Sequence, residues 1–418
     1  MIKPHQIQSI LGSSIGNVLE WYDFGLFAMY SSLFSRLFFP SKDAHSALIM
    51  TFGILAIGFL CRPIGSVIFG YLGDKQGRAK TLRLSILMIS IPTLLIGFLP
   101  TYAEIGILAP TLLTLIRIWQ GISLGGEYSG NLIYLVESSP KPYRATITSF
   151  AATGANVGIL LAASVSAIVN YLLNDHLFQT IGWRIPYILS GVLSLFIYFT
   201  RLKLQETKVF SELKKHHRLV KNPISFVFKH NIPYMLRIMG LTCMGSTFYY
   251  LCFVFMPTFL MQNLNYSMKK ASSLMTFFIA TMILFVPLAG RLCDQISRKK
   301  MLLFNATVIT IFTIPAFNLL LDNYSLVVFL VLILLTIASS LEQATTSVAV
   351  VENYPPPARY AGLSIGYNIS NAFFGGTAPL ICEALIHKTH FLLAPAVYIV
   401  ACSILTGLVV LFFVSDAP

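Results

Sequence analysis

Long blocks of apolar residues recur along the whole chain, and they limit its possible folds more than any other feature. Examples are residues 86–99, 185–200 and 326–338. A helix that crosses the hydrocarbon core of a bilayer needs about 20 mainly apolar residues. Only 11% of the 418 residues are charged, whereas soluble domains average about 25%. We therefore predict an all-α, polytopic membrane protein and exclude a soluble enzyme or a disordered chain.

Breaks at polar, proline and glycine residues divide the apolar blocks into twelve candidate membrane-spanning helices. Six of them precede residue 202 and six follow residue 231. We predict a six-helix bundle over 1–201, a cytoplasmic linker over 202–231 and a second six-helix bundle over 232–418. The linker is the longest polar stretch and could also bind anionic lipid.

Lysines and arginines are distributed unevenly between the loops on the two sides of these spans. Of the 29, we count twenty on the side of the termini, six on the opposite side and three inside spans. Because positively charged loops stay in the cytoplasm, we predict that both termini are cytoplasmic and that the protein lies in a bacterial inner membrane. The net charge of +13 therefore reflects topology and does not indicate nucleic-acid binding.

Two motifs that combine acidic and basic residues occur once in each half, in equivalent cytoplasmic loops. In one, an arginine lies one helical turn after an aspartate, and the copies are at 74–78 and 294–298. In the other, a glutamate and an arginine flank a short stretch that includes prolines, and the copies are at 137–144 and 352–359. The repeated residues are Asp74, Arg78, Glu137 and Arg144 in the first half and Asp294, Arg298, Glu352 and Arg359 in the second.

This internal repeat indicates two halves of the same topology. Parallel repeats of this kind are typical of secondary transporters whose halves move around a site near the bilayer midplane. We expect the repeated charges to close a cytoplasmic gate, with Arg78 near Glu137 and Glu352 paired with Arg359. Anchoring of the basic residues at the membrane surface is the alternative.

Six further motifs make the chain resemble a known family. They are GNVLEWYDF at 16–24, RPIG at 62–65, RIWQG at 117–121, GGE at 125–127, GWRIP at 182–186 and FGGTAP at 374–379. Together with the loop at 70–80 they resemble the metabolite:proton symporter branch of the major facilitator superfamily, which includes proline/betaine transporters and permeases for alpha-ketoglutarate, citrate and shikimate. The resemblance implies a fold of twelve transmembrane helices in two parallel six-helix repeats. It also implies uptake of a small organic solute with protons, without choosing the solute.

Carboxylates inside the spans are the candidates for proton coupling. Ionisable groups are costly in a bilayer and usually face a partner or a cavity, and burial favours the neutral form of an acid. We expect Asp23, Glu20 and Glu127 to take part in proton coupling. As an alternative, Asp23 or Glu20 could form a structural ion pair with Arg62.

The fourth predicted span carries several polar residues on one face. Arg117, Gln120, Glu127 and Asn131 follow helical spacing. Arg117 and Glu127 are about 15 Å apart along the axis at 1.5 Å per residue, so each needs a partner elsewhere. Arg117 could form a structural ion pair or contact the solute.

Other polar and aromatic groups in the spans are expected to contact the solute. A guanidinium can hold a carboxylate with two parallel hydrogen bonds, a role that the resemblance also implies for Arg62. Aromatic rings can bind a quaternary ammonium or can simply pack, and an acid at Glu342 would suit a zwitterionic or cationic solute. Arg184 could instead be an interfacial arginine at a helix end. The expected solute-binding residues are Arg62, Asn17, Arg117, Gln120, Arg184, Tyr249, Glu342 and Asn368.

The sequence thus predicts a monomeric secondary transporter that imports a small organic solute, of the proline/betaine type or an organic acid, with protons by alternating access. The proton gradient would supply the energy, with no cofactor or metal and with the lipid bilayer as the other partner. No nucleophile–base motif or phosphate-binding loop indicates an enzyme, and the six cysteines lack the spacing of a metal site. A proton-driven exporter of the same superfamily is the main alternative, and a membrane sensor is a further one.

Overall fold

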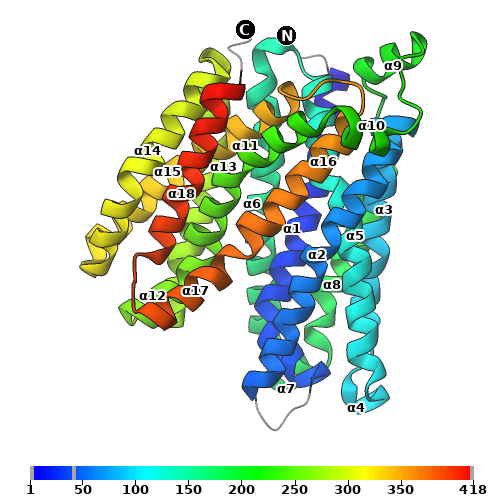
Figure 1. The fold of residues 1–418 in the computed structure, drawn as a ribbon. Coiled ribbons are helices and arrows are strands. Elements are labelled where there is room, and N and C mark those ends of the chain that lie inside the picture. Colours follow the sequence, from blue (N-terminus) through cyan, green and yellow to red (C-terminus); the bar gives the residue numbers. More distant parts are fainter. Residues whose placement is uncertain (1–3, 40–43, 415–418) are drawn as a thin grey trace. The chain divides into compact units, whose positions relative to one another are not determined.

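The computed structural model describes residues 4–39 and 44–414, and these ranges contain helices without strands (Figure 1). The predicted all-α class is therefore confirmed. The chain divides into two compact units. The first contains the residues up to Ser138 together with Gly154–Ile224, and the second contains Ser139–Thr153 together with the residues from Ser225 onward.

The first unit is built on six long helices. These are α1 (Pro4–Phe38), α2 (Ala44–Gln76), α3 (Arg78–Phe98), α5 (Leu108–Ser138), most of α6 (Arg144–Leu172) and α8 (Arg184–Arg201). Short helical segments connect them: α4 (Tyr102–Ile105), α7 (Asp175–Leu177) and the wider turn η2 (Phe178–Gly182). After α8, the polar segment predicted as a linker forms α9 (Lys208–Lys215) and α10 (Pro223–His230).

Glycines let α2 and α5 pack with their backbones in contact. A Cβ atom on Gly121 would overlap the backbone of Gly58, and one on Gly125 would overlap the carbonyl oxygen of Arg62. Small residues permit such close approach between membrane helices. The contact fixes α5, which carries the polar face predicted from the sequence, against the helix that carries Arg62.

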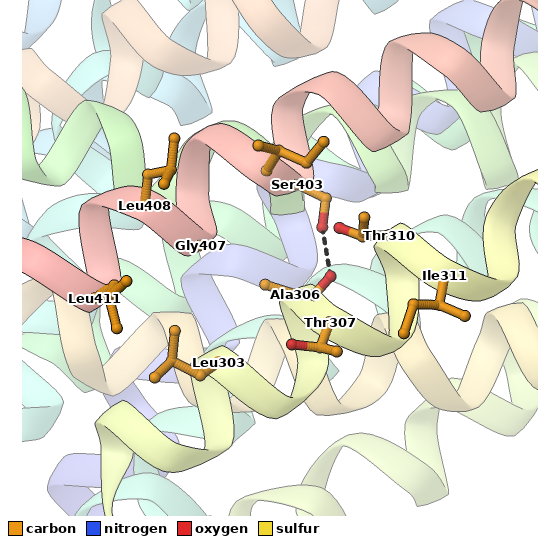
Figure 2. A pocket seen from close by; sticks show the side chains of 10 residues that line it. Leu303, Ala306, Thr307, Thr310, Ile311, Ser403, Gly407, Leu408 and Leu411 are labelled. Carbon is orange, nitrogen blue, oxygen red and sulfur yellow. Dashed lines mark hydrogen bonds between the residues drawn. The ribbon is translucent and has the colours of Figure 1, made fainter.

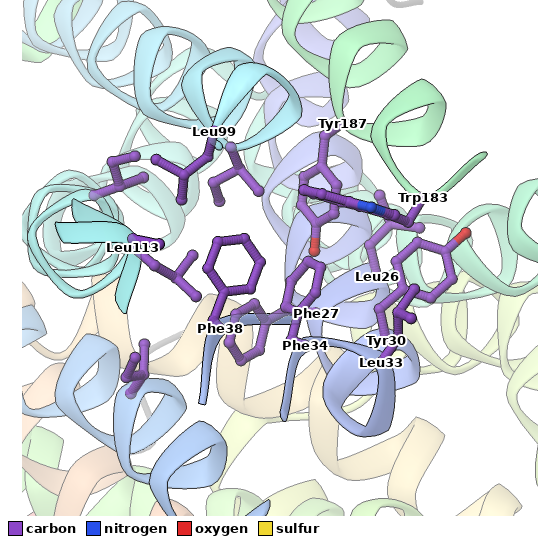
Figure 3. Close-up of a cluster of buried hydrophobic side chains, with 14 of the residues drawn as sticks. Leu26, Phe27, Tyr30, Leu33, Phe34, Phe38, Leu99, Leu113, Trp183 and Tyr187 are labelled. Atoms are coloured by element: carbon purple, nitrogen blue, oxygen red, sulfur yellow. The ribbon is translucent and has the colours of Figure 1, made fainter. Parts of the chain in front are cut away.

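An aromatic cluster at one end of the first unit explains the Gly-Trp-Arg-Ile-Pro motif (Figure 3). Trp183 is fully buried, and its ring meets that of Phe34 edge-on at a centroid distance of 5.3 Å. Tyr187, one helical turn further on, stacks on the same phenylalanine at 5.9 Å. This packing ties the start of α8 to α1.

The second unit repeats the six-helix pattern with two interrupted helices. One membrane-spanning segment consists of α11 (Ile232–Tyr249), the π-helical turn η3 (Tyr250–Phe255) and α12 (Met256–Leu264); another consists of α16 (Arg359–Ser370), the π-helical turn η4 (Asn371–Gly376) and α17 (Ala378–Thr389). The continuous helices are α13 (Met268–Gln295), α14 (Arg298–Leu321), α15 (Ser325–Glu352) and α18 (Ala394–Phe413). The short helix η1 (Lys141–Tyr143) and the start of α6 also belong to this unit.

Ten of the helical segments among the described residues are long and apolar enough to cross a membrane. The two other long helices, α1 with 35 residues and α5 with 31, also exceed the length of a span. They are the helices that carry Glu20, Asp23, Arg117 and Glu127. The predicted twelve-helix polytopic architecture is confirmed.

Candidate functional site

The centre of the first unit holds an ion pair between α1 and α5. Asp23 accepts a hydrogen bond from Nη1 of Arg117 at 2.8 Å and another from the amide of Gln120 at 3.1 Å. The same amide donates to the hydroxyl of Thr93 on α3 at 2.8 Å. Asp23 is 5% exposed. Three helices thus meet at one buried carboxylate, which gives Arg117 the partner that the sequence required.

Asp23 uses only part of the hydrogen-bonding capacity of the Arg117 guanidinium. Its guanidinium lies over the ring of Phe27, 3.8 Å from the centroid, and its Nε and Nη2 atoms donate no hydrogen bond within the described part of the chain. Buried guanidinium donors without acceptors are costly. A carboxylate brought to this position by a ligand would satisfy them.

Glu20 and Arg62 form a second, looser pair between α1 and α2. The closest nitrogen–oxygen distance is 3.8 Å, and neither carboxylate oxygen of Glu20 accepts a hydrogen bond from the residues that the structure describes. The guanidinium of Arg62 lies 4.5 Å from the centroid of the Phe59 ring. Asn17, one turn earlier on α1, is fully buried beside this region of the helix. Of the two carboxylates that were expected as alternative partners of Arg62, Glu20 lies beside it, whereas Asp23 pairs with Arg117.

Glu127 pairs with a residue that sequence reasoning missed. Both of its oxygens accept hydrogen bonds from Arg201, at 2.5 and 3.0 Å, and it also accepts one from the hydroxyl of Ser85. Arg201 donates as well to the carbonyl oxygens of α1 and α3, and both charged side chains are fully buried. Arg201 is the last residue of α8, and its buried guanidinium belongs to the packing of the first unit. The sequence signal for this partner was that Glu127, about 15 Å from Arg117 along α5, needed a cation from another helix.

The loop motif of the first half forms a compact charge cluster. Arg78 pairs with Asp74 at 3.2 Å and with Glu137 at 3.4 Å, as expected for the gate residues. Its guanidinium also lies 5.1 Å from the centroid of the ring of Phe210, on α9. Arg78 is almost completely buried, so the cluster is part of the packing between helices and not a solvated surface.

The start of the polar segment after α8 completes this cluster, which the sequence did not indicate. Glu206 accepts hydrogen bonds from the backbone N–H groups of Arg78 and Ala79, at the N-terminus of α3. Carboxylates stabilise helix N-termini by satisfying these donors. The hydroxyl of Thr207 donates to Glu137 at 2.6 Å and also caps α9. The consecutive residues Glu206 and Thr207 therefore contact the cluster at the start of α3 and at Glu137.

The corresponding motif of the second half pairs differently from our expectation. Glu352 forms ion pairs with Arg144 at 3.2 Å and with Arg298 at 3.4 Å. Arg359, the partner expected from the sequence, donates its Nε–H to the carbonyl oxygen of Tyr354 at 2.9 Å. Because 139–153 packs within the second unit, Arg144 is available to this glutamate.

Asp294 caps the start of α6 in the same cluster. Its carboxylate accepts hydrogen bonds from the backbone N–H groups of Ala145 at 2.8 Å and Thr146 at 2.9 Å, and pairs with Arg298 at 3.4 Å. Asp294 thus has the same chemistry as Glu206, a carboxylate at a helix N-terminus. Each half therefore holds a helix start with an acid from another segment.

The second unit presents a polar and aromatic face where its two π-helical turns meet. The hydroxyl of Ser246 donates to the amide oxygen of Asn371 at 3.1 Å, and the hydroxyl of Thr247 donates to the carbonyl oxygen of Phe374 at 2.9 Å. Tyr249 stacks on Phe253 at a centroid distance of 5.7 Å. Such π-helical turns are frequent at functional sites.

Two further expected solute-binding residues have local partners. The amide of Asn368 donates to the carbonyl oxygen of Ser364 at 2.8 Å, one turn earlier on α16. Arg184 donates to the carbonyl oxygens of Gly97 and Leu99 at the end of α3, at 3.2 and 2.6 Å. These carbonyl contacts favour the helix-end role for Arg184.

Glu342 forms no ion pair with the described residues of the second unit. It is 3% exposed on α15, and its carboxyl group lies directly over Gly245 of α11, where a Cβ atom would overlap it. Its Oε1 atom accepts no hydrogen bond from the described residues. Tyr249 follows Gly245 by one helical turn and therefore lies on the same side of α11.

A groove lies between α14 and α18 in the second unit (Figure 2). Its volume is about 280 Å³, and its lining includes Leu303, Leu408 and Leu411. The hydroxyl of Ser403 donates to the carbonyl oxygen of Ala306 at 2.9 Å across it. None of its lining residues is ionisable.

The described residues contain no group of three or more His, Cys, Asp or Glu that could hold a metal ion.

Comparison with known proteins identifies the family. The sequence profile of the Major Facilitator Superfamily matches residues 14–378 and, in a second match, 238–418. A putative proline/betaine transporter of Staphylococcus aureus strain MSSA476 is 36% identical over 408 residues, which cover 97% of this chain and 87% of the relative. The glycine betaine/proline/ectoine/pipecolic acid transporter OusA of Dickeya dadantii is 31% identical, with 96% of this chain and 82% of the relative covered.

Solved structures share the fold. The proton:xylose symporter XylE bound to 6-bromo-6-deoxy-D-glucose superposes with a TM-score of 0.81 at 16% identity, over all of this chain and 97% of that one. A partially occluded, inward-open structure of XylE from E. coli gives 0.70 at 16% identity, over 99% of this chain and 100% of that one. The chain belongs to the Major Facilitator Superfamily, as a multi-pass membrane transporter of small solutes related to the proline/betaine transporters.

Proposed function

We propose that this protein imports a small organic solute of the proline/betaine type together with protons, by alternating access. The relatives with this name are 31–36% identical over nearly the whole chain, and a proton symporter shares the fold. The observation that carries the proposal is the buried pair of Asp23 and Arg117, in which the arginine keeps donors without acceptors among the described residues.

This pair can couple a proton to a solute. While Asp23 is ionised, it holds Arg117 through a charge-assisted hydrogen bond, which is stronger than a neutral one. When Asp23 takes a proton, that attraction is lost, and Arg117 gains from a solute carboxylate instead. Proton and solute would then bind together and leave together, because each removes the electrostatic cost of the other's binding. Glu20 beside Arg62 is the second candidate for this chemistry, and Glu127 is a positioning residue that holds Arg201.

Each unit offers its own groups for a zwitterionic solute. In the first unit, Arg62 and Arg117 offer guanidinium groups for a carboxylate, with Gln120 beside Asp23 and Asn17 on α1. In the second unit, the stacked rings of Tyr249 and Phe253 offer a surface for a cationic nitrogen. Asn368, whose amide donates along its own helix, would act as a neutral polar contact.

The repeated loop motifs are proposed to act as the cytoplasmic gate. The ion pairs of Arg78 with Asp74 and Glu137, and of Glu352 with Arg144 and Arg298, hold helix ends together on each unit. Breaking them would release the helix starts of α3 and α6. We further propose that the transporter works as a monomer in a bacterial plasma membrane, with both termini in the cytoplasm.

The test is uptake of labelled solutes by the purified protein in liposomes with an inward proton gradient. Proline and glycine betaine should accumulate, and citrate and 2-oxoglutarate serve as organic-acid comparisons. Accumulation that persists after a protonophore collapses the gradient would overturn proton symport. Efflux driven by the opposite gradient, without uptake, would indicate an exporter.

Asp23→Asn separates the coupling role from solute binding. The amide keeps a hydrogen-bond acceptor for Arg117 but cannot release a proton. We expect gradient-driven accumulation to fall by more than about tenfold, corresponding to at least about 1.4 kcal/mol, while exchange of internal for external solute persists. Accumulation at the wild-type level would remove Asp23 from the coupling mechanism.

A further inference from the structure

Glu342 is a buried acid whose negative charge no described residue neutralises. It forms no ion pair within the described ranges, and its Oε1 atom accepts no hydrogen bond there. The carboxyl group packs on the backbone of α11 at Gly245. The polar group beside it on α15 is the neutral hydroxyl of Thr346, one turn further on. An ionised carboxylate in such surroundings is strongly disfavoured.

The internal repeat provides a direct comparison. The spacing that relates the gate glutamates Glu137 and Glu352 also relates Glu127 to Glu342. In the first unit, Glu127 is neutralised by Arg201 and accepts a further hydrogen bond from Ser85. The last long helix of the second unit, α18 (Ala394–Phe413), carries no lysine or arginine, whereas α8 of the first unit ends in Arg201. Among the described residues, the second unit therefore has the acid without a cation that corresponds to Arg201.

The position that matches Ser85 does not replace the lost partner. The spacing between the loop aspartates Asp74 and Asp294 relates Ser85 to Asn305 on α14. The amide of Asn305 donates to the carbonyl oxygen of Ala338 at 3.4 Å. Asn305 is buried, and its side-chain oxygen accepts no hydrogen bond from the described residues. The hydroxyl donor that the first unit gives to its acid is therefore replaced by an amide engaged elsewhere.

No charged group on the helices packed around α15 forms an ion pair with Glu342 within the described ranges. Arg237 is the only cation of α11, and it precedes Gly245 by eight residues, about 12 Å along the axis. On the same helices and on α15 itself, the other ionisable residues are Lys269, Lys270, Arg291, Cys293 and Asp294 on α13, Arg298, Lys299 and Lys300 on α14, Glu352 on α15, Arg359, Tyr360 and Tyr367 on α16, and Tyr234, Cys243 and Tyr249 on α11.

We propose that Glu342 is a proton-binding site of the second unit, separate from Asp23. In the arrangement described here its carboxyl group holds a proton, which removes the cost of the missing cation. The proton is released when the surroundings of α11 and α15 admit water or a cation. Glu342 was expected from the sequence to contact the solute, and the absence of a charged partner among the described residues favours the proton instead. Its part in transport rests on the proposed symport, whereas the protonation itself does not.

The protonation can be measured without a solute. Infrared difference spectra of the reconstituted protein between alkaline and acidic pH should contain the carbonyl stretch of a buried, protonated carboxylic acid. This band should be lost in Glu342→Gln and should persist, at a shifted frequency, in Glu342→Asp. Glu127→Gln is the matched control from the first unit, because the acid that it removes is ion-paired; Glu352→Gln is used if that variant does not fold.

Two infrared results would overturn the protonation of Glu342. A band that is unchanged in Glu342→Gln, or a wild-type spectrum without it, shows that Glu342 holds no exchangeable proton. If Glu342→Gln does not fold, the band shift in Glu342→Asp decides. The result is independent of whether proline or betaine is transported, so failure of the proposed function leaves this measurement intact.

The role in coupling is tested by the number of protons moved with each solute molecule, measured from the reversal potential in liposomes. Glu342→Gln should carry one proton fewer than wild type and should retain solute exchange. An unchanged number would overturn the coupling role. Loss of exchange in Glu342→Gln, with Glu342→Asp active, would overturn it as well, because the carboxylate would then bind the cationic nitrogen of the solute.

Discussion

The pair of Glu127 and Arg201 is the residue-scale feature on which the first unit depends most clearly. Both side chains are fully buried, and Gly16 of α1 lies so close that a Cβ atom there would overlap both of them. Removing one partner leaves an uncompensated buried charge, which costs about 3–5 kcal/mol. We expect Glu127→Gln or Arg201→Gln to lower the thermal unfolding temperature of the purified protein markedly.

The double variant is the control for this explanation. With both charges removed, no ion remains uncompensated, so part of the lost stability should return relative to the single variants. Losses that simply add would contradict a direct pairing. Gly16→Ala should resemble the single variants, because its methyl group would displace the same side chains.

Sequence reasoning predicted the residues of this region better than their partners. The helical spacing of Arg117, Gln120 and Glu127 located the polar face of α5, and their need for outside partners followed from the rise per residue. Asp23 and Arg117 were both expected to be functional, yet their contact was not predicted, because helix–helix register depends on packing that periodicity does not encode. Arg201 was missed since a cation at a span end looks the same as a loop charge.

Among the helices, the start of α3 depends on an acid from a distant segment. Glu206 accepts hydrogen bonds from the first N–H groups of this helix, next to Gly77, whose φ of 113° suits glycine. Replacing such an N-terminal acceptor costs about 0.5–2 kcal/mol. In Glu206→Ala we expect faster hydrogen exchange in residues 78–82, measured by mass spectrometry. Glu212→Ala, on the neighbouring α9, is the control and should leave that exchange unchanged.

The contact between α2 and α5 tests helix packing separately from charge. Gly125→Val would drive a side chain into the carbonyl of Arg62 and should abolish folding or sharply reduce the yield of monodisperse protein. Gly53→Ala is the matched control on α2, since no atom lies within 4 Å of a Cβ there. Normal yield of the valine variant would show that these helices can separate without loss of the fold.

The helices themselves were the most predictable level of the structure. Apolar blocks of sufficient length, interrupted by Pro, Gly and charged residues, predicted all the long helices. The π-helical turns η3 and η4 were not predicted. They lie against each other, with Gly375 of η4 packed on Tyr250 of η3, and such a tertiary contact leaves no periodic signal in the sequence. Helices α9 and α10 also form in the segment that we predicted as a linker, since Phe210 and Val227 are buried.

For the whole molecule, the distribution of positive charge predicts its orientation. In a variant without the native cysteines, Lys141→Cys should face the cytoplasm and Lys388→Cys the outside. Both lysines are exposed on the protein surface. A thiol reagent that does not cross membranes should therefore label only the second variant in intact cells. Labelling of Lys141→Cys instead would invert the proposed topology, and permeabilised cells provide the control.

Residues 139–153 have a consequence for any attempt to divide this protein. They precede the predicted linker in sequence, yet they pack with the second unit, where Arg144 meets Glu352 and Asp294 caps the start of α6. A C-terminal fragment produced by cutting the backbone near residue 218 would lack this segment of its own packing. The two fragments should therefore recover transport only when synthesised together, because the N-terminal fragment carries the segment on which the second unit packs.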